Sequence, residues 1–210
     1  MSDAPARSSY RHGDLRQALI DAALDMARQG GPDAVVLREA TRRAGVSPNA
    51  AYRHFADRRD LLEAASASAQ GLAADAMEDA LEAVHGTGDP AVDARLRVGA
   101  VGRGYLAFAR HEPGLFRTAF TVPNDLSRAF DADKAGRRGR TPFQVLAESL
   151  DALHAAGVLP DERRQGAELL AWSTVHGLGM LALDGPLRGL TDEMLDGATE
   201  RLLLMVDRGL

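Results

Sequence analysis

Residues 37–55 read LREATRRAGVSPNAAYRHF, and this stretch decides which fold the sequence indicates. Gly45 follows a run of helix-forming residues, and glycine readily takes the left-handed conformation that ends a helix in a tight turn. Ser47 is a preferred N-cap and Pro48 a preferred first helical residue, so a second short helix is predicted from there to about Phe55–Ala56. Two short helices joined by a tight turn form a helix-turn-helix.

The predicted second helix has one apolar arc and one polar arc when its residues are placed about 100° apart. Ala51 and Phe55 share the apolar arc and are expected to anchor the helix in a core. Asn49, Ala50 and Arg53 are expected to face outward. The second helix of such a unit enters the DNA major groove, where asparagine pairs with adenine and a small apolar side chain meets the thymine methyl group.

Small side chains around the turn fit the same interpretation. Ala40, Thr41 and Ala44 are small where two helices must cross closely, and Val46 is apolar and can fix the turn in a core. The start of the second helix presents unpaired N–H groups, which favour phosphate. Short capped helices are also common in ordinary helical cores, so the pattern alone leaves a purely structural role open.

The rest of the chain has apolar residues at helical spacing, with no alternating β-branched run and no internal repeat. Glycine, proline and aspartate clusters are predicted to end the helices, as in HGTGDP at residues 85–90. The segment 121–140 is rich in Asp, Arg and Gly and is predicted to be a loop. The fold class is therefore all-α, with about nine helices at 13–29, 37–44, 47–56, 57–85, 89–110, 115–120, 142–156, 161–183 and 192–208.

The composition limits the location and the partners of the chain. Its 210 residues are 45% hydrophobic and include no cysteine, which excludes disulfides, thiolate metal sites and cysteine nucleophiles. No stretch resembles a signal peptide or approaches the ~18 apolar residues of a membrane span, so a cytoplasmic location is expected. Residues 1–60 carry 10 Arg and 8 acidic residues, whereas the remainder carries 15 basic and 22 acidic residues. This asymmetry permits a DNA-binding head on an acidic body.

Two longer stretches carry a specific resemblance. LREATRRAGVSPNAAYRHFADRRDLLEA (Leu37–Ala64) and YRHGDLRQALIDAALDMARQGG (Tyr10–Gly31) resemble the DNA-binding head of the TetR family of bacterial transcriptional regulators. AWSTVHGLGML (Ala171–Leu181) is similar, over a shorter stretch, to the Trp-His-Gly signature of one group of TetR C-terminal domains. Residues 1–12 are polar and are expected to form a flexible arm. The resemblance implies a DNA-binding domain at 13–60 with its helix-turn-helix at about 36–55, and a ligand-binding and dimerisation domain at 61–210.

The resemblance also implies an activity. It implies a homodimeric transcriptional repressor that binds a palindromic operator in double-stranded DNA and is released by a small-molecule effector. It implies no enzymatic activity, no cofactor and no membrane partner.

Roles in DNA binding follow from the resemblance residue by residue. The family's base-contacting positions are Ser47, Pro48, Asn49 and Ala50 in this chain, and its phosphate-contacting positions are Arg38, Tyr52, His54 and Arg58. Val36 replaces a frequent threonine at the start of the second head helix, so a contact from cap to phosphate is expected to be lost. Ala51 replaces a commonly larger apolar residue and is expected to loosen the recognition helix.

The helices predicted at 161–183 and 192–208 each have an apolar stripe. These stripes predict a four-helix interface between two subunits, although a core within one subunit fits the pattern as well. The expected interface residues are Leu169, Gly177, Gly179, Leu195, Ala198 and Leu202. A polar histidine among apolar residues can bond a ligand, and aromatic residues can form the walls of a cavity, although each also fits plain core packing. The expected ligand residues are Tyr105, Phe108, Phe116, Phe120, Trp172, His176 and Met180.

Other kinds of site have weaker signals. The six histidines are scattered without metal-ligand spacing, and GRGYLA at 102–107 follows no strand, so it is interpreted as small residues at helix crossings rather than a dinucleotide loop. GRRGR at 136–140 is expected to be a solvated basic loop. A small-molecule-binding protein or enzyme with a vestigial head, and a helical adaptor that binds proteins, remain alternative function classes.

Overall fold

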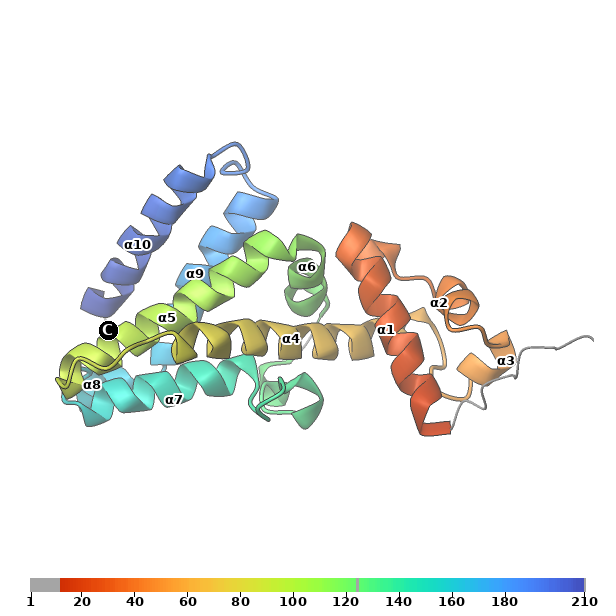
Figure 1. Cartoon of the computed structure of the whole chain (residues 1–210), viewed down its shortest axis with the longest axis horizontal. Helices are drawn as coiled ribbons and strands as arrows, with labels where there is room; N and C mark the ends of the chain where they lie inside the picture. The colour runs from red at the N-terminus through yellow and green to blue at the C-terminus, as the bar shows by residue number, and fades with distance from the viewer. Residues whose placement is uncertain (1–11, 124, 210) are drawn as a thin grey trace, which may run out of the picture.

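The computed structural model describes residues 12–123 and 125–209, and over these ranges the chain forms helices and loops without strands. The molecule is elongated, with a small head at one end and a larger helical body at the other (Figure 1). The head contains α1 (His12–Gly30), α2 (Leu37–Arg43) and α3 (Pro48–Ala51). The body contains α4 (Arg58–Glu82), α5 (Pro90–His111), α6 (Pro113–Thr121), α7 (Pro142–Ala155), α8 (Asp161–Arg164), α9 (Ala167–Leu183) and α10 (Asp192–Gly209).

Side-chain caps fix where three of the long helices begin. Asp57 accepts a hydrogen bond from the Asp60 amide at the start of α4, and Asp89 accepts from two amides at the start of α5. Thr141 and Gln144 form a reciprocal capping box at the start of α7. The predicted starts of these helices are therefore confirmed to within a residue.

The long helix α4 joins the two parts of the molecule. Its first residues belong to the head, and the rest of the helix runs through the body between α5 and α7 (Figure 1). Gly104 of α5 allows the closest approach, because a Cβ at this position would lie 2.6 Å from the carbonyl oxygen of Ala76. A Cβ on Gly102 would likewise collide with the side chain of Leu203 in α10. The interpretation of GRGYLA as small residues at helix crossings is confirmed.

The loop between α6 and α7 is more ordered than the sequence indicates. It contains two short 3₁₀ helices, η2 (Leu126–Arg128) and η3 (Ala132–Lys134), in addition to η1 (Pro32–Ala34) in the head. Residues 137–139 of GRRGR are exposed, as expected for a solvated loop, but its arginines also form ion pairs with carboxylates along α4, which the sequence did not indicate. This contact fixes the loop, and therefore the start of α7, against the body.

The helix boundaries differ from the prediction at two other places. The helix predicted at 161–183 is divided into α8 and α9 by Gly166, which has a φ of +80°, so the described residues form ten α-helices. The recognition helix is also shorter than expected, because the α-helical hydrogen bonding of α3 gives way to a turn at Tyr52. No helix in the described ranges is long and apolar enough to cross a bilayer.

Candidate functional site

The turn between α2 and α3 has the geometry that its sequence predicts. Gly45 has a φ of +67°, and a Cβ there would meet no atom within 4 Å, so the glycine is needed for its backbone conformation rather than for space. The Val46 amide donates to the carbonyl of Thr41 at 3.1 Å and closes the turn. Ala40 and Thr41 are buried at the crossing, which confirms their expected role.

Buried anchors on one side hold α3 in place. The Ser47 hydroxyl accepts a hydrogen bond from the Ala50 amide at 3.3 Å, which confirms the predicted cap. Ala51 is fully buried and Phe55 is 2% exposed, so both lie in the core as expected. The guanidinium of Arg16, from α1, lies 5.3 Å from the centre of the Phe55 ring. The short helix therefore has a fixed position although it has only one α-helical turn.

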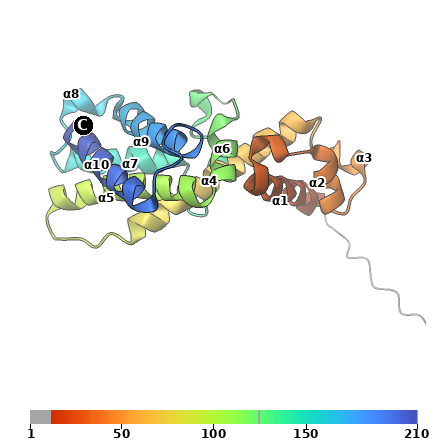
Figure 2. The ribbon, with the colours of Figure 1, turned by 90° about the horizontal axis from the view of Figure 1, so that it is seen from above.

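The opposite side of α3 is open to solvent. Tyr52 is 58% exposed. In both views α3 lies at the end of the molecule remote from the body (Figure 1, Figure 2). Of the residues expected to contact DNA, Ala50 and His54 are half-buried, and the exposed ones are Arg38, Ser47, Pro48, Asn49, Tyr52, Arg53 and Arg58.

Arg58 differs from the other expected contacts because its guanidinium already has partners in the protein. Its Nε donates to the carbonyl of Val35 at 2.6 Å, and its Nη2 donates to the carbonyl of Pro32 at 2.7 Å. These bonds hold the segment before α2 against the start of α4. A phosphate contact by Arg58 stays a prediction. In such a contact, the same guanidinium would bind the phosphate and hold the segment before α2.

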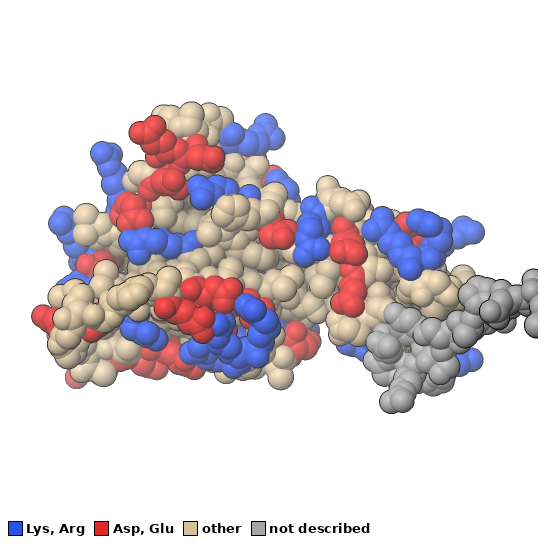
Figure 3. All heavy atoms as spheres, viewed as in Figure 1, with Lys and Arg blue, Asp and Glu red and all other residues tan. Residues whose placement is uncertain are grey.

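Arginines gather over α2 at the outer end of the head (Figure 3). Val36 is the N-cap residue of α2 and makes no side-chain cap bond, as its identity predicts. Glu39 pairs with Arg42 at 2.7 Å and with Arg43 at 2.8 Å, and hydrogen bonds from these two arginines lower its pKa to about 2. Glu39 therefore stays ionised and offsets part of the positive charge of this surface.

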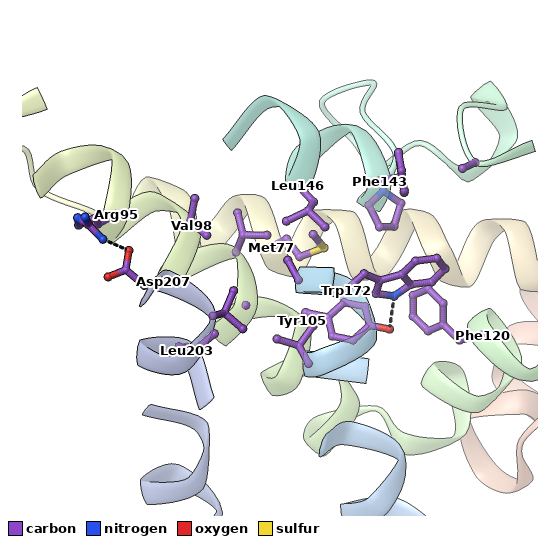
Figure 4. A pocket seen from close by; sticks show the side chains of 18 of the residues that line it. Met77, Arg95, Val98, Tyr105, Phe120, Phe143, Leu146, Trp172, Leu203 and Asp207 are labelled. Atoms are coloured by element: carbon purple, nitrogen blue, oxygen red, sulfur yellow. Dashed lines mark hydrogen bonds and ion pairs between the residues drawn. The ribbon is translucent and has the colours of Figure 1, made fainter. Parts of the chain in front are cut away.

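A cavity of about 90 Å³ lies in the body between α4, α5, α7, α9 and α10 (Figure 4). Its walls are mainly apolar, with Met77, Val98, Leu146 and Leu203 along its length (Figure 4). Among the residues expected to contact a ligand, Tyr105, Phe120 and Trp172 line this cavity. Phe108, Phe116, His176 and Met180 lie outside its lining.

A hydrogen-bonded triad closes one end of the cavity. The Tyr105 hydroxyl lies 2.9 Å from Nδ1 of His176 and accepts a hydrogen bond from Nε1 of Trp172 at 3.2 Å. Burial raises the pKa of the Tyr105 hydroxyl and lowers the pKa of His176, so both side chains are neutral at pH 7. The histidine therefore positions a wall residue of the cavity.

An aromatic cluster continues from the cavity towards the head. The Phe120 ring lies 5.2 Å from the Tyr105 ring and 5.0 Å from the Phe116 ring, and both phenylalanines belong to α6. At the start of α6, a Cβ on Gly114 would lie 2.7 Å from the carbonyl oxygen of Arg28 in α1, and the side chain of Arg28 pairs with Glu112 at 3.0 Å. α6 therefore contacts the cavity lining at one end and the head at the other.

The outer faces of α9 and α10 expose several large apolar side chains. Of the expected interface residues, Leu169 is exposed and Gly177 is open, but a Cβ on Gly179 would lie 3.3 Å from Phe116 inside the protomer. Leu195, Ala198 and Leu202 are half-buried. The other exposed apolar residues of the two helices are Leu170, Leu181, Met194, Leu204 and Met205.

Sequence reasoning missed most of the cavity wall and part of the exposed apolar face. Arg95 and Asp207 form an ion pair at the end of the cavity opposite Tyr105 (Figure 4), and 112 residues separate them in the chain. Gln70 of α4 also lines the cavity and donates to the carbonyl of Ala119 at 3.0 Å. Within the described part of the chain, no group of three or more His, Asp or Glu side chains could hold a metal ion.

Comparisons with known proteins cover both parts of the chain. Residues 19–65 match the family model described as bacterial regulatory proteins, tetR family, and residues 98–206 match the tetracyclin repressor-like C-terminal domain. A search of curated protein sequences finds no match.

Solved structures with the same fold include three that cover nearly the whole chain. A protein of unknown function from Rhodococcus sp. RHA1 is 28% identical, with a TM-score of 0.67, over 97% of this chain and 99% of that chain. A proposed tetR family transcription regulator from Shewanella sp. PV-4 is 19% identical, with a TM-score of 0.60, over 90% and 95% of the two chains. A TetR family transcription regulator from Marinobacter aquaeolei VT8 is 18% identical, with a TM-score of 0.50, over 90% and 93%.

Proposed function

Because the chain belongs to the TetR family, whose members are DNA-binding transcriptional regulators and not enzymes, we propose that it is a dimeric repressor released from its operator by a small molecule. Residues 13–60 form its DNA-binding unit and residues 61–210 its ligand-binding and dimerisation unit. It acts in the cytoplasm, where the DNA is accessible. The observation that carries the proposal is the solvent-exposed side of α3, opposite the buried Ala51 and Phe55.

The residues of α3 and of the turn that follows it divide into two roles in the proposed complex. Asn49 and Ala50 contact base edges in the major groove, while Tyr52, Arg53 and His54 contact phosphates at its borders. A palindromic operator matches the two-fold symmetry of a dimer, with half-sites about 34 Å apart or a multiple of that distance. Neutralised phosphates release counterions, so DNA binding weakens as salt rises.

Selection of fragments of the organism's own genome on the purified protein, followed by affinity measurements, tests DNA binding. Arg53→Ala is expected to weaken binding to the selected fragment about tenfold, because it removes an exposed charge beside the groove. Arg163→Ala is the matched control, since Arg163 is also exposed but belongs to α8 at the far end of the body (Figure 1). Equal affinities of the two variants, or no fragment bound at low salt, would contradict the proposal.

The proposed dimer forms through the outer faces of α9 and α10. Leu170 is 62% exposed in the protomer and is one of six large apolar side chains that α9 and α10 expose, a number that favours burial by a partner. Leu170→Glu is expected to give monomers in light scattering and to weaken operator binding, because two linked heads bind more tightly than one. Leu126→Glu replaces an equally apolar exposed residue on η2, away from this face, and should leave the dimer intact.

The proposed response to a ligand rests on the cavity and on α6. A ligand in the cavity contacts Phe120 of α6, and the start of the same helix contacts α1 at Gly114. Ligand binding shifts the population towards a head arrangement that no longer fits the operator, provided that the ligand binds the two arrangements with different affinity. If no small molecule changes the operator affinity, the proposed ligand response is wrong and the protein is a constitutive regulator.

A further inference from the structure

The cavity of the body has a chemical character that its family does not determine. We propose that its ligand is an uncharged, slender and mainly apolar small molecule carrying at most one neutral polar group, such as a hydroxyl. This inference rests on the proposed ligand response, but it concerns binding to the body and can be tested without DNA.

The residues that line the cavity first determine whether its ligand can carry a charge. Of the described residues that line the cavity, Arg95 and Asp207 are the charged ones, and they form an ion pair with each other. A ligand ion in the apolar part of the cavity would lose its hydration without gaining an unpaired counter-charge, which is unfavourable. A ligand carboxylate beside Arg95 would also lie beside the like charge of Asp207, and a ligand ammonium beside Asp207 would also lie beside Arg95. The pair therefore favours neither sign of ligand charge.

The triad at the other end decides which polar group fits there. Trp172 Nε1 can only donate, so the Tyr105 oxygen accepts from it. The arrangement that gives the Tyr105 hydrogen an acceptor has this hydroxyl donating to Nδ1 of the neutral His176. The Trp172 and Tyr105 donors are then used within the triad, and the Tyr105 oxygen keeps one lone pair. A ligand hydroxyl can donate to that oxygen, whereas a carboxylate would find an acceptor where it needs a donor.

Gln70 offers the remaining polar contact. Its amide nitrogen donates to the carbonyl of Ala119, which fixes the orientation of the side chain. The amide oxygen and the second N–H keep capacity for a neutral ligand group. Neither can compensate a full charge as an ionised side chain would.

The dimensions of the cavity favour a slender molecule. The lining follows α5 from Arg95 to Tyr105, which is about 15 Å along a helix axis at 1.5 Å per residue. A volume of about 90 Å³ over this length leaves a narrow space between Met77, Leu146 and Leu203 (Figure 4). A short alkyl chain fits this shape better than a fused ring system.

Three probes of equal chain length test the ligand class, namely 1-octanol, octanoate and octylammonium. Trp172 is the one tryptophan of the chain and lines the cavity, so its fluorescence reports binding directly. We expect 1-octanol to bind the wild-type dimer at least tenfold more tightly than either ion. Equal or tighter binding of octanoate or octylammonium, or no change in emission with any probe, would overturn the inference.

Two valines of α5 provide a matched pair of variants that locate the binding site. Val98 lines the cavity and is buried, whereas Val92 is exposed and outside the lining. Val98→Phe should abolish the fluorescence response to 1-octanol, and Val92→Phe should retain it. Ala171→Val narrows the same cavity more gently and should weaken binding if Val98→Phe fails to fold. A response that survives filling of the cavity would place the alcohol elsewhere and overturn the assignment.

The ion pair itself can be altered to change the selectivity. Asp207→Asn leaves Arg95 without its counter-charge and should raise the affinity for octanoate about tenfold, with little effect on 1-octanol. Arg95→Gln should favour octylammonium in the same way. Unchanged selectivity in both variants would overturn the charge argument. If 1-octanol binds as expected but operator affinity does not respond to it, the ligand class stands and the proposed ligand response fails.

Discussion

Replacement of Glu78 by glutamine should destabilise the body by an amount that the structure sets. Glu78 lies on α4 with 1% of its surface exposed, and its carboxylate pairs with Arg140 at 2.6 Å and with Arg138 at 3.5 Å. Removal of one partner from a fully buried ion pair costs about 3–5 kcal/mol. Both arginines are about a third exposed and keep other carboxylate partners, so a smaller loss of about 2–3 kcal/mol is expected.

Thermal unfolding followed by circular dichroism measures this loss. For a chain of this size, about 2–3 kcal/mol corresponds to a decrease in Tm of roughly 5–10 °C. Asp79→Asn is the matched control, because Asp79 is on the same helix and pairs with Arg138 at 3.1 Å but is 55% exposed. Asp79→Asn should lower the free energy of unfolding by about 0.5 kcal/mol, as is typical when a surface ion pair is lost. Equal decreases in Tm for the two variants would refute the claim that burial gives Glu78 its importance.

Three further predictions concern the head, the triad and the contact between head and body. Ser47→Ala removes the cap of α3 and should cost about 1 kcal/mol locally, seen as weaker operator binding with little change in Tm. Burial lowers the pKa of His176, so the neutral side chain makes its full contribution to the stability of the fold above its ordinary pKa of about 6.5. This contribution is lost as the pH falls through the lowered value. The Tm of His176→Asn should therefore fall less than that of the wild type between about pH 7.5 and about pH 5.5. Gly114→Ala should lower the Tm strongly because its Cβ would overlap the Ala27 carbonyl, whereas Gly197→Ala in open space on α10 should raise stability by up to about 1 kcal/mol.

The local features of the head could be predicted because they follow from rules within a few residues. Gly45, Ser47 and the pair Ala51 and Phe55 have conformations or burial that sequence spacing alone determines. The length of α3 was overestimated, since the polar residues after Ala51 continue as a turn with mixed hydrogen bonding. The spacing of polar and apolar residues after Ala51 fits such a turn as well as it fits a helix, so it could not show where α3 ends.

The features that were not predicted depend on contacts between distant parts of the chain. The bonds of Arg58 to two carbonyls, and the ion pairs of the 136–140 loop with α4, join segments that no local pattern connects. The division of the predicted helix at Gly166 was missed because a single glycine is often tolerated within a helix. The cavity depends on how α10 packs across α5, so the pairing of Arg95 with Asp207 has no local signature.

The base preference of the Asn49→Ala variant tests the central claim most directly. Binding of the wild type and the variant to a library of operator sequences shows which base pair each position requires. If α3 enters the major groove, the variant should lose its preference at one position in each half-site, at a cost of about 1–3 kcal/mol, and keep it at the others. An unchanged preference profile, with operator affinity equal to that of the wild type, would contradict the placement of α3 on the bases.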